Sequence, residues 1–385
     1  MSDRSPSRSI RLSEVAALWA RIGCTGFGGP PAHIALLRGL CVDKKRWLTA
    51  HEFEDAVAAC NLLPGPASTQ LAIFCAWRVG GPIGAIVGGL AFIVPGLAAI
   101  LVLAAVFLAG SPPAWVRGAG AGAGAAVAVV AVRAGIALVP ESWRRADARW
   151  RWVAYAVLGG IGAATVGPWL VLVLLGCGIV EVLWRLPERQ GGTGAHLWPL
   201  ATAAASATDG VLALVWVAFK VGALAYGGGF VIIPLMQADA VDAYHWMTNT
   251  EFLNAVALGQ ITPGPVTQTV AVVGYAAYGI GGGLLAAFIA FLPSFSFVLL
   301  GARRFDALRT NARVRAFLGG AGPAAVGAII GVSIPLAFAL DEWWQLGVLV
   351  GAAVALLVFR RGVVTTLLAA GGVGVLAAVF GAPLP

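Results

Sequence analysis

Two Pro-Gly-Pro tripeptides interrupt apolar sequence, and the polar side chains best suited to bind a ligand follow them directly. Hydroxyl and amide groups in the first turn of a helix can hydrogen-bond an oxyanion without adding charge, and a helix N-terminus adds free N–H donors and a positive dipole end. Capping of these helices and hydrogen bonding between helices are the alternative roles. The candidates are Ser68, Thr69 and Gln70 behind Pro64, Gly65 and Pro66, and Thr267 and Gln268 behind Pro263, Gly264 and Pro265.

Further candidates precede these interruptions. Asn61 and Gln260 occupy matched positions before the tripeptides and are neutral groups suited to closing a binding site. Arg21 and Lys220 lie in apolar sequence, where a cation is costly and marks a functional candidate. Snorkelling to the interface is the alternative, especially for Arg21 near the N-terminus, whereas we expect Lys220 to face a cavity. Each cation precedes a glycine-rich break, made of Gly26, Phe27, Gly28 and Gly29 or of Tyr226, Gly227 and Gly228.

Nothing typical of an enzyme or a metal site accompanies these residues. The sequence has no phosphate-binding GxxxxGK[ST] loop, so ATP-driven transport by this chain is not expected. The five Cys and four His residues show no metal-ligand spacing, and no nucleophile–base–acid set stands out. We therefore expect a protein that is not an enzyme and that uses no metal or cofactor.

The two sets of candidates belong to two copies of one segment, offset by 199 residues, as between Pro64 and Pro263. The match needs no gap. We predict two repeats, at 1–185 and 210–385, joined by a linker at 186–209 that is a poor span and whose crossing stays undecided. Glu52 and Glu251 start segments in the two copies, which favours capping over ligand binding. The other matched pairs are Gly23 and Gly222, Trp47 and Trp246, Gly80 and Gly279, Gly84 and Gly283, and Phe92 and Phe291.

The composition predicts an all-α polytopic membrane protein. The chain is 59% hydrophobic and only 11% charged, with a mean hydropathy of +0.88. Continuous apolar runs long enough to cross hydrocarbon lie at 83–109, 118–139 and 283–301. A soluble domain of this length would need far more charge on its surface.

The distribution of Lys and Arg predicts that the two repeats are inverted. The loop at 38–51 is basic, whereas its counterpart at 237–250 has no Lys or Arg. The loop at 141–151 has four Arg and its counterpart near Asp341 and Glu342 has none; conversely, the loop at 110–117 has one Arg and its counterpart at 302–315 has five. Since basic loops stay cytoplasmic, equivalent loops should lie on opposite sides and the N-terminus should be cytoplasmic. The net charge of +8 therefore reports topology and does not indicate a nucleic-acid partner.

The glycine and proline breaks should lie at the interface between the repeats. Residues 12–40 and 52–80 are each interpreted as a pair of half-helices that dips to the middle of the bilayer. Irregular backbone at that depth is tolerated only where it is buried in protein or lines a cavity. Inverted repeats with broken or re-entrant helices typically hold a transport site between them.

These residues also carry a resemblance to a known family. The stretch from Gly26 to Ile34, Trp47-Leu-Thr, Leu62 to Pro66 and Arg78-Val-Gly-Gly, with the second copy, resemble the long-chain members of the chromate ion transporter (CHR) family. The resemblance implies an antiporter-like protein of the bacterial inner membrane that moves chromate out of the cytoplasm, with sulfate as a competitor and proton motive force or anion exchange as the drive. The sequence departs from the family pattern at Arg21, where Lys is frequent, and at the second glycine break.

Several functions stay open at this stage. A sulfate or other oxyanion transporter would have the same site, because sulfate and chromate are both tetrahedral dianions. A membrane-bound chromate reductase acting through Cys24 or Cys60 is an alternative of another class, as is a passive anion channel. The oligomeric state is also open, with a homodimer as one alternative.

Overall fold

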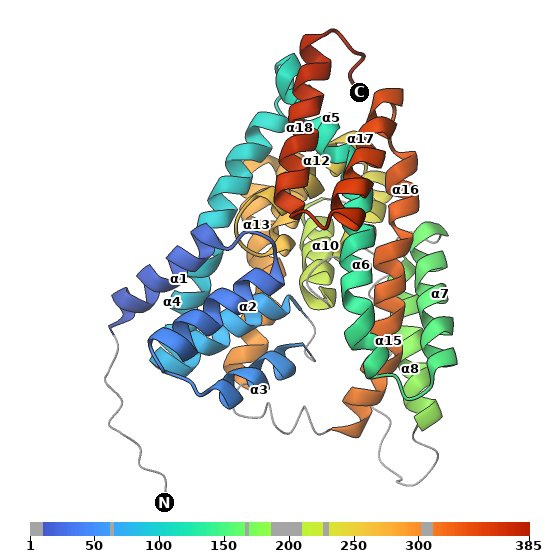
Figure 1. Ribbon diagram of the computed structural model, residues 1–385. Helices are drawn as coiled ribbons and strands as arrows, with labels where there is room; N and C mark the ends of the chain where they lie inside the picture. Colours follow the sequence, from blue (N-terminus) through green and yellow to red (C-terminus); the bar gives the residue numbers. More distant parts are fainter. Residues whose placement is uncertain (1–10, 62–64, 166–168, 186–209, 226–230, 302–310) are drawn as a thin grey trace, which may run out of the picture.

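The computed structural model describes residues 11–61, 65–165, 169–185, 210–225, 231–301 and 311–385 (Figure 1). None of these residues forms a strand, and most of them are helical. The helices long and apolar enough to cross a membrane are Ala67–Phe107, Ala114–Arg144, Val266–Gly301 and Ala312–Phe338. The predicted all-α polytopic class is confirmed.

Each half begins with the same series of elements. In the first half these are α1 (Leu12–Thr25), α2 (Pro30–Arg38), a π-helix (Gly39–Lys44), α3 (Ala50–Cys60) and α4 (Ala67–Phe107). In the second half they are α10 (Val211–Leu224), α11 (Ile232–Gln237), a π-helix (Ala238–Ala243), α12 (Asn249–Ile261), a 3-10 turn (Val266–Gln268) and α13 (Thr269–Gly301). Identical capping boxes start α3 and α12, so the duplicated sequence folds into duplicated local structure.

Glu52 and Glu251 take the capping role that the sequence favours. The Thr49 side chain accepts from the Glu52 N–H, and the Glu52 carboxylate accepts from the Thr49 N–H; Thr248 and Glu251 do the same. The Thr49 N–H holds the pKa of Glu52 below its usual value, and Arg78, 2.5 Å from the carboxylate, adds to this effect. Arg78 is therefore the ion-pair partner of Glu52 in this structure.

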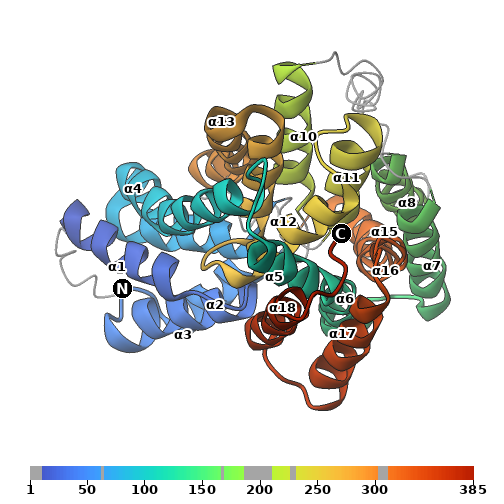
Figure 2. The same cartoon turned by 90° about the horizontal axis from the view of Figure 1, so that it is seen from above.

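The remaining helices exchange partners between the halves. The first half continues with α5 (Ala114–Ala125), α6 (Val127–Arg144), α7 (Arg149–Thr165) and α8 (Leu170–Arg185); the second continues with α15 (Ala312–Gly331), α16 (Ser333–Phe338), α17 (Trp343–Ala353), a π-helix (Val354–Val358) and α18 (Val363–Val379). Helix α15 packs on α7 and α8, while α5 packs on α18 (Figure 2). Neither half is therefore a self-contained bundle.

The gap-free match between the copies is wrong by one residue beyond the Pro-Gly-Pro tripeptides. Gly65 and Gly264, which both have positive φ, are 199 positions apart, but the equivalent helix kinks at Gly81 and Gly279 are 198 apart. The second copy starts with a 3-10 turn. Three residues of 3-10 helix rise about 6 Å, as do four residues of α-helix, so one residue fewer covers the same length.

This shift changes which polar residues correspond. A Cβ atom at Gly23 would lie 2.5 Å from the Phe92 carbonyl oxygen, and one at Gly222 would lie 2.0 Å from that of Ala290. Phe92 therefore corresponds to Ala290 and not to Phe291. By the same shift, Thr69 corresponds to Thr267 and Gln70 to Gln268.

The outer surface carries large apolar side chains of the kind that contact lipid. Leu300 is 82% exposed, Phe338 86% and Trp343 77%. Such surface would be costly in water, whereas in a bilayer it matches the acyl chains.

We predict that Gly159→Val destabilises the packing of α7 on α15. A Cβ atom at Gly159 would lie 1.9 Å from the Ala324 carbonyl oxygen, so the helices must separate. Overpacking of this kind costs about 1–3 kcal/mol. Thermal unfolding in detergent should show a clear drop in midpoint for Gly159→Val and little change for Gly176→Val, where a Cβ atom meets nothing within 4 Å. Equal midpoints for the two variants would contradict the packing.

Candidate functional site

The interrupted segments of the two halves meet in the interior. The Gly264 N–H donates to the Gly26 carbonyl oxygen over 3.1 Å, which joins the second Pro-Gly-Pro to the first glycine break. A Cβ atom at Gly65 would lie 3.3 Å from the Gly222 carbonyl oxygen, so the first Pro-Gly-Pro approaches α10 of the second half. Gly65 has φ 115° and Gly264 φ 100°, values that disfavour other residue types. The sequence placed these breaks at the repeat interface, and the described backbone has this arrangement.

The polar side chains behind the tripeptides are fully buried. Ser68, Thr69, Gln70, Thr267 and Gln268 are each 2% exposed or less. The hydroxyl oxygens of Thr69 and Thr267 have no hydrogen-bond partner within the described protein. A buried polar group left unpaired costs about 1–3 kcal/mol, so hydroxyls kept in this position point to a ligand-binding role.

Two further groups extend this polar region. Gln268 donates through Nε2 to the Ile93 carbonyl oxygen over 2.8 Å, while its Oε1 has no partner among the described residues. Ser294 of α13 is fully buried and its hydroxyl is likewise unpaired. Its Oγ would lie 3.2 Å from a Cβ atom at Gly65, so it belongs to the same region. Ser294 was not predicted, since a serine within an apolar run gives no signal by itself.

His33 is a second residue that sequence reasoning missed. Its Nε2 lies 2.9 Å from the Gly26 carbonyl oxygen and its Nδ1 lies 3.3 Å from Ser68 Oγ, with the side chain fully buried. A carbonyl oxygen only accepts, so Nε2 carries the proton and Nδ1 accepts from the Ser68 hydroxyl. His33 thus fixes the break at Gly26 to the first turn of α4. The one feature of the sequence that could have identified His33 is its position in the first turn after Pro30, where α2 begins.

Lys220, which we expected to face a cavity, is buried, lines neither of the two pockets and is already paired. Its Nζ lies 2.8 Å from Oδ1 and 2.5 Å from Oδ2 of Asp239, and the two side chains are 7% and 4% exposed. This role of Asp239 was not predicted, because the acidic residues at 237–250 are separated from Lys220 along the chain. Arg21, the counterpart of Lys220, is exposed. The two matched cations therefore have different environments, and that of Arg21 suits the snorkelling alternative.

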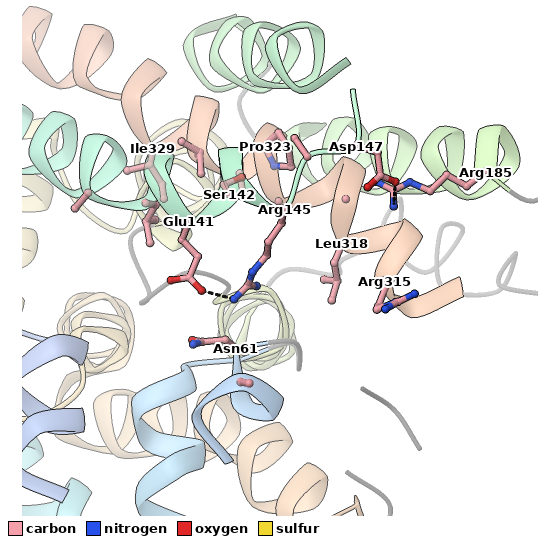
Figure 3. Close-up of a pocket in the computed structure, with 18 residues that line it drawn as sticks. Asn61, Glu141, Ser142, Arg145, Asp147, Arg185, Arg315, Leu318, Pro323 and Ile329 are labelled. Carbon is pink, nitrogen blue, oxygen red and sulfur yellow. Dashed lines mark hydrogen bonds and ion pairs between the residues drawn. The ribbon is translucent and has the colours of Figure 1, made fainter. Parts of the chain in front are cut away.

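Asn61 lies at the edge of a basic pocket of about 620 Å³ (Figure 3). Three arginines, Arg145, Arg185 and Arg315, line it together with residues of α6 and α15. Arg145 is ion-paired with Glu141, and Arg185 Nη1 lies 2.5 Å from Asp147 Oδ2. For Arg315 no ion pair to another described residue is found. Gln260, the counterpart of Asn61, is instead buried, and its Nε2 has no partner among the described residues.

The other predicted residues are less informative. Gly28 and Gly29 adopt positive φ just before α2, and Phe27 is 46% exposed. Pro66 and Pro265 immediately precede the helical turns, as expected. Pro64, Tyr226, Gly227 and Gly228 lie outside the described residues. Among the residues that the structure describes, no group of three His, Cys, Asp or Glu side chains could hold a metal ion.

The fold and site together define a class: a polytopic α-helical membrane protein whose broken helices meet at a buried polar centre, as in secondary transporters. The profile of the family described as chromate transporter matches residues 13–182 and again 212–375. The chain belongs to this family, whose named members are transport proteins and not enzymes.

Three relatives illustrate the similarity. The chromate transport protein of Cupriavidus metallidurans is 31% identical, over 85% of this chain and 82% of its own length. The chromate transport protein of Pseudomonas aeruginosa is 30% identical, over 84% and 80%. The probable chromate transport protein of Synechococcus elongatus is 27% identical, over 84% of each. No solved structure matches the chain at a significant level.

We predict that Lys220→Gln destabilises the fold and that adding Asp239→Asn restores much of the loss. Removing one partner of a buried ion pair leaves the other charge uncompensated, which costs about 3–5 kcal/mol. Thermal unfolding of the two single variants and the double variant forms a double-mutant cycle. Additive effects of the two substitutions would show that the side chains do not interact.

Proposed function

We propose that this protein is a secondary transporter of a tetrahedral oxyanion that exports chromate from the bacterial cytoplasm across the inner membrane, driven by proton motive force or by anion exchange. The observation that carries the proposal is the meeting of the two broken regions at Gly26 and Gly264, beside buried hydroxyls that have no hydrogen-bond partner among the described residues. The family supports chromate as the cargo.

The dianion would bind between the two Pro-Gly-Pro breaks. The hydroxyls of Thr69 and Thr267 and the second Nε2 hydrogen of Gln268 would replace part of its hydration shell with neutral hydrogen-bond donors, and the helix starts behind Pro66 and Pro265 would supply backbone N–H groups. Neutral donors suit a transported anion, because a site with full opposite charge would bind it too tightly to release it. Gly28 and Gly29 would let the backbone approach the ligand closely.

Two inverted repeats would give alternating access to this site. In Figure 1 the α6–α7 connection, rich in Arg, lies at the lower end, and the α4–α5 and α16–α17 connections lie at the upper end. Under the positive-inside rule the lower end would be cytoplasmic, with the N-terminus on that side. Reciprocal packing of α15 on α7 and of α5 on α18 is compatible with a two-fold relation between the repeats at 1–185 and 210–385.

The basic pocket at Asn61 would be the cytoplasmic vestibule. Its volume of about 620 Å³ exceeds that of a single oxyanion, so a hydrated dianion fits. Arg145 and Arg185 are held by carboxylates, which leaves Arg315 as the arginine available to attract an anion. Asn61 lines this pocket and precedes the first Pro-Gly-Pro along the chain.

Sulfate is the second candidate cargo, since it has the same shape and charge. Chromate uptake into everted vesicles or proteoliposomes containing the purified protein, with and without excess sulfate, tests both. Accumulation that sulfate blocks supports the chromate exporter. Sulfate flux without chromate flux would keep the site and replace the substrate, and no flux of either anion would overturn the proposal.

We predict that Thr267→Val raises the KM for the anion about tenfold to a hundredfold in this assay. The substitution keeps the shape and removes a hydrogen bond to a charged group, worth about 1.5–3 kcal/mol. Thr366→Val is the matched control: Thr366 is also buried, but its hydroxyl donates to the Gly362 carbonyl oxygen within α18. An unchanged KM for Thr267→Val would remove this hydroxyl from the site.

We predict that Arg315→Gln raises the KM at low ionic strength and flattens its dependence on salt, with the maximal rate unchanged. An exposed cation acts mainly by attracting the anion, and salt screens that effect. Arg313→Gln, which changes an exposed arginine outside the pocket, should have a smaller effect. Identical salt dependence of the two variants would argue against the vestibule.

A further inference from the structure

The ion pair between Lys220 and Asp239 is electrically neutral as it stands. The ammonium group contacts both carboxylate oxygens, and the two residues lie on α10 and on the π-helix that follows α11. A dianion near Lys220 would therefore meet an adjacent negative charge as well as a positive one. Lys220 can offset the charge of a cargo only when Asp239 no longer neutralises it.

The pair is not part of the scaffold that the two halves share. The π-helix after α2 has the same length as that after α11, yet the position of Asp239 is taken there by Leu40. The position of Lys220 is taken by an exposed arginine, Arg21. Since the first half builds the same elements without the pair, forming these elements does not require it. A buried ion pair adds little stability by itself, so a functional role is the better explanation.

Charged residues are rare on the helices that pack against the pair: α11 and α13, which pack on α10, carry none. A second pocket, of about 560 Å³, is lined by Gln237 and Ala238, the residues before Asp239, and by Thr165 of α7 and Asn249 of α12. Asp242 is the charged residue in its lining and is exposed, as is His245. Glu251 at the start of α12 is held by Thr248. Lys220 is thus the charged group that contacts Asp239.

The two pockets lie toward opposite ends of one span. The pocket at Asn61 is lined by residues of α15 from Arg315 to Ile329, and the second pocket by residues from Ile334 to Ala339 in and just after α16. These helices together form the span Ala312–Phe338. The second pocket therefore lies beside the residues that precede Asp239, on the side opposite the basic vestibule.

We propose that Asp239 is the proton-binding residue of the transport cycle: it takes up one proton when the oxyanion binds, and so frees Lys220 to face the anion. The proposal rests on the proposed function. The proton comes from water in the second pocket and adds to a carboxylate oxygen, giving a neutral carboxylic acid, while Lys220 stays an ammonium ion. Without that proton, moving Lys220 toward the anion would leave a buried carboxylate uncompensated, at a cost of several kcal/mol.

The coupling links the affinity for the anion to pH. The linkage is reciprocal, so anion affinity should rise about tenfold per unit fall in pH where one full proton is taken up.

Calorimetry of the purified full-length protein tests the proposal. Sulfate, and chromate at mildly alkaline pH where it is a dianion, are titrated in buffers of different ionisation enthalpy. The wild type should take up about one proton per anion. Asp239→Asn should take up about none and lose the pH dependence of its affinity, whereas Asp239→Glu should keep both. The matched control is Asp43→Asn, an exposed aspartate of the first π-helix, which should behave as the wild type.

The outcomes distinguish the role of Asp239 from the proposed transport function. Binding by the wild type without proton uptake, or unchanged uptake in Asp239→Asn, overturns the role of Asp239 and leaves the proposed function intact. Absence of binding of both anions to the wild type overturns both proposals. If Asp239→Asn does not fold, infrared difference spectra of the wild type replace it: a protonated-carboxyl band should appear on anion binding, and its absence overturns the proposal.

Discussion

The structure depends on the requirement that backbone polar groups inside a bilayer find partners within the protein. Glycine and proline interrupt the helices at Gly26 and at the two Pro-Gly-Pro tripeptides, which removes the local partners of those groups. The Gly264 N–H resolves part of this by donating to the Gly26 carbonyl oxygen, and His33 donates to the same oxygen. The breaks are thus tolerable only together, so the halves must associate through them. This association brings the buried hydroxyls of both halves into one region.

The duplicated scaffold has acquired different polar groups in its two halves. The first half carries His33 against Ser68, whereas the position of His33 in the second half is the buried Ile232. The second half carries the pair of Lys220 and Asp239, for which the first half has no equivalent. The shared capping boxes and π-helices show that the fold does not require this difference. A polar centre built in this way is not two-fold symmetric, and the cargo would meet a different set of groups on each side.

Much of the fold was predictable from the sequence because its determinants are local. Hydropathy indicated the membrane class, and the glycine and proline positions located the breaks that bound α2, α4 and α13. The polar groups behind each tripeptide were also predictable, since their role depends on the adjacent helix start. The correspondence of Phe92 with Phe291 was wrong because the 3-10 turn at Val266–Gln268 shortens the second copy by one residue. A match of the two copies without gaps cannot detect such a change from α-helix to 3-10 helix.

The sequence by itself determined the class and the duplication and singled out Lys220 as a cation in apolar sequence, because each follows from composition or from a pattern along the chain. The tertiary structure decided which distant groups meet: Lys220 with Asp239, His33 with Ser68, and Gly26 with Gly264. It also placed Asn61 at a pocket with three arginines while burying its counterpart Gln260. Such contacts depend on how whole helices pack, and helices α5 and α15 pack across the halves. The side chain that neutralises a buried charge is therefore set by the three-dimensional arrangement, and no spacing along the chain encodes it.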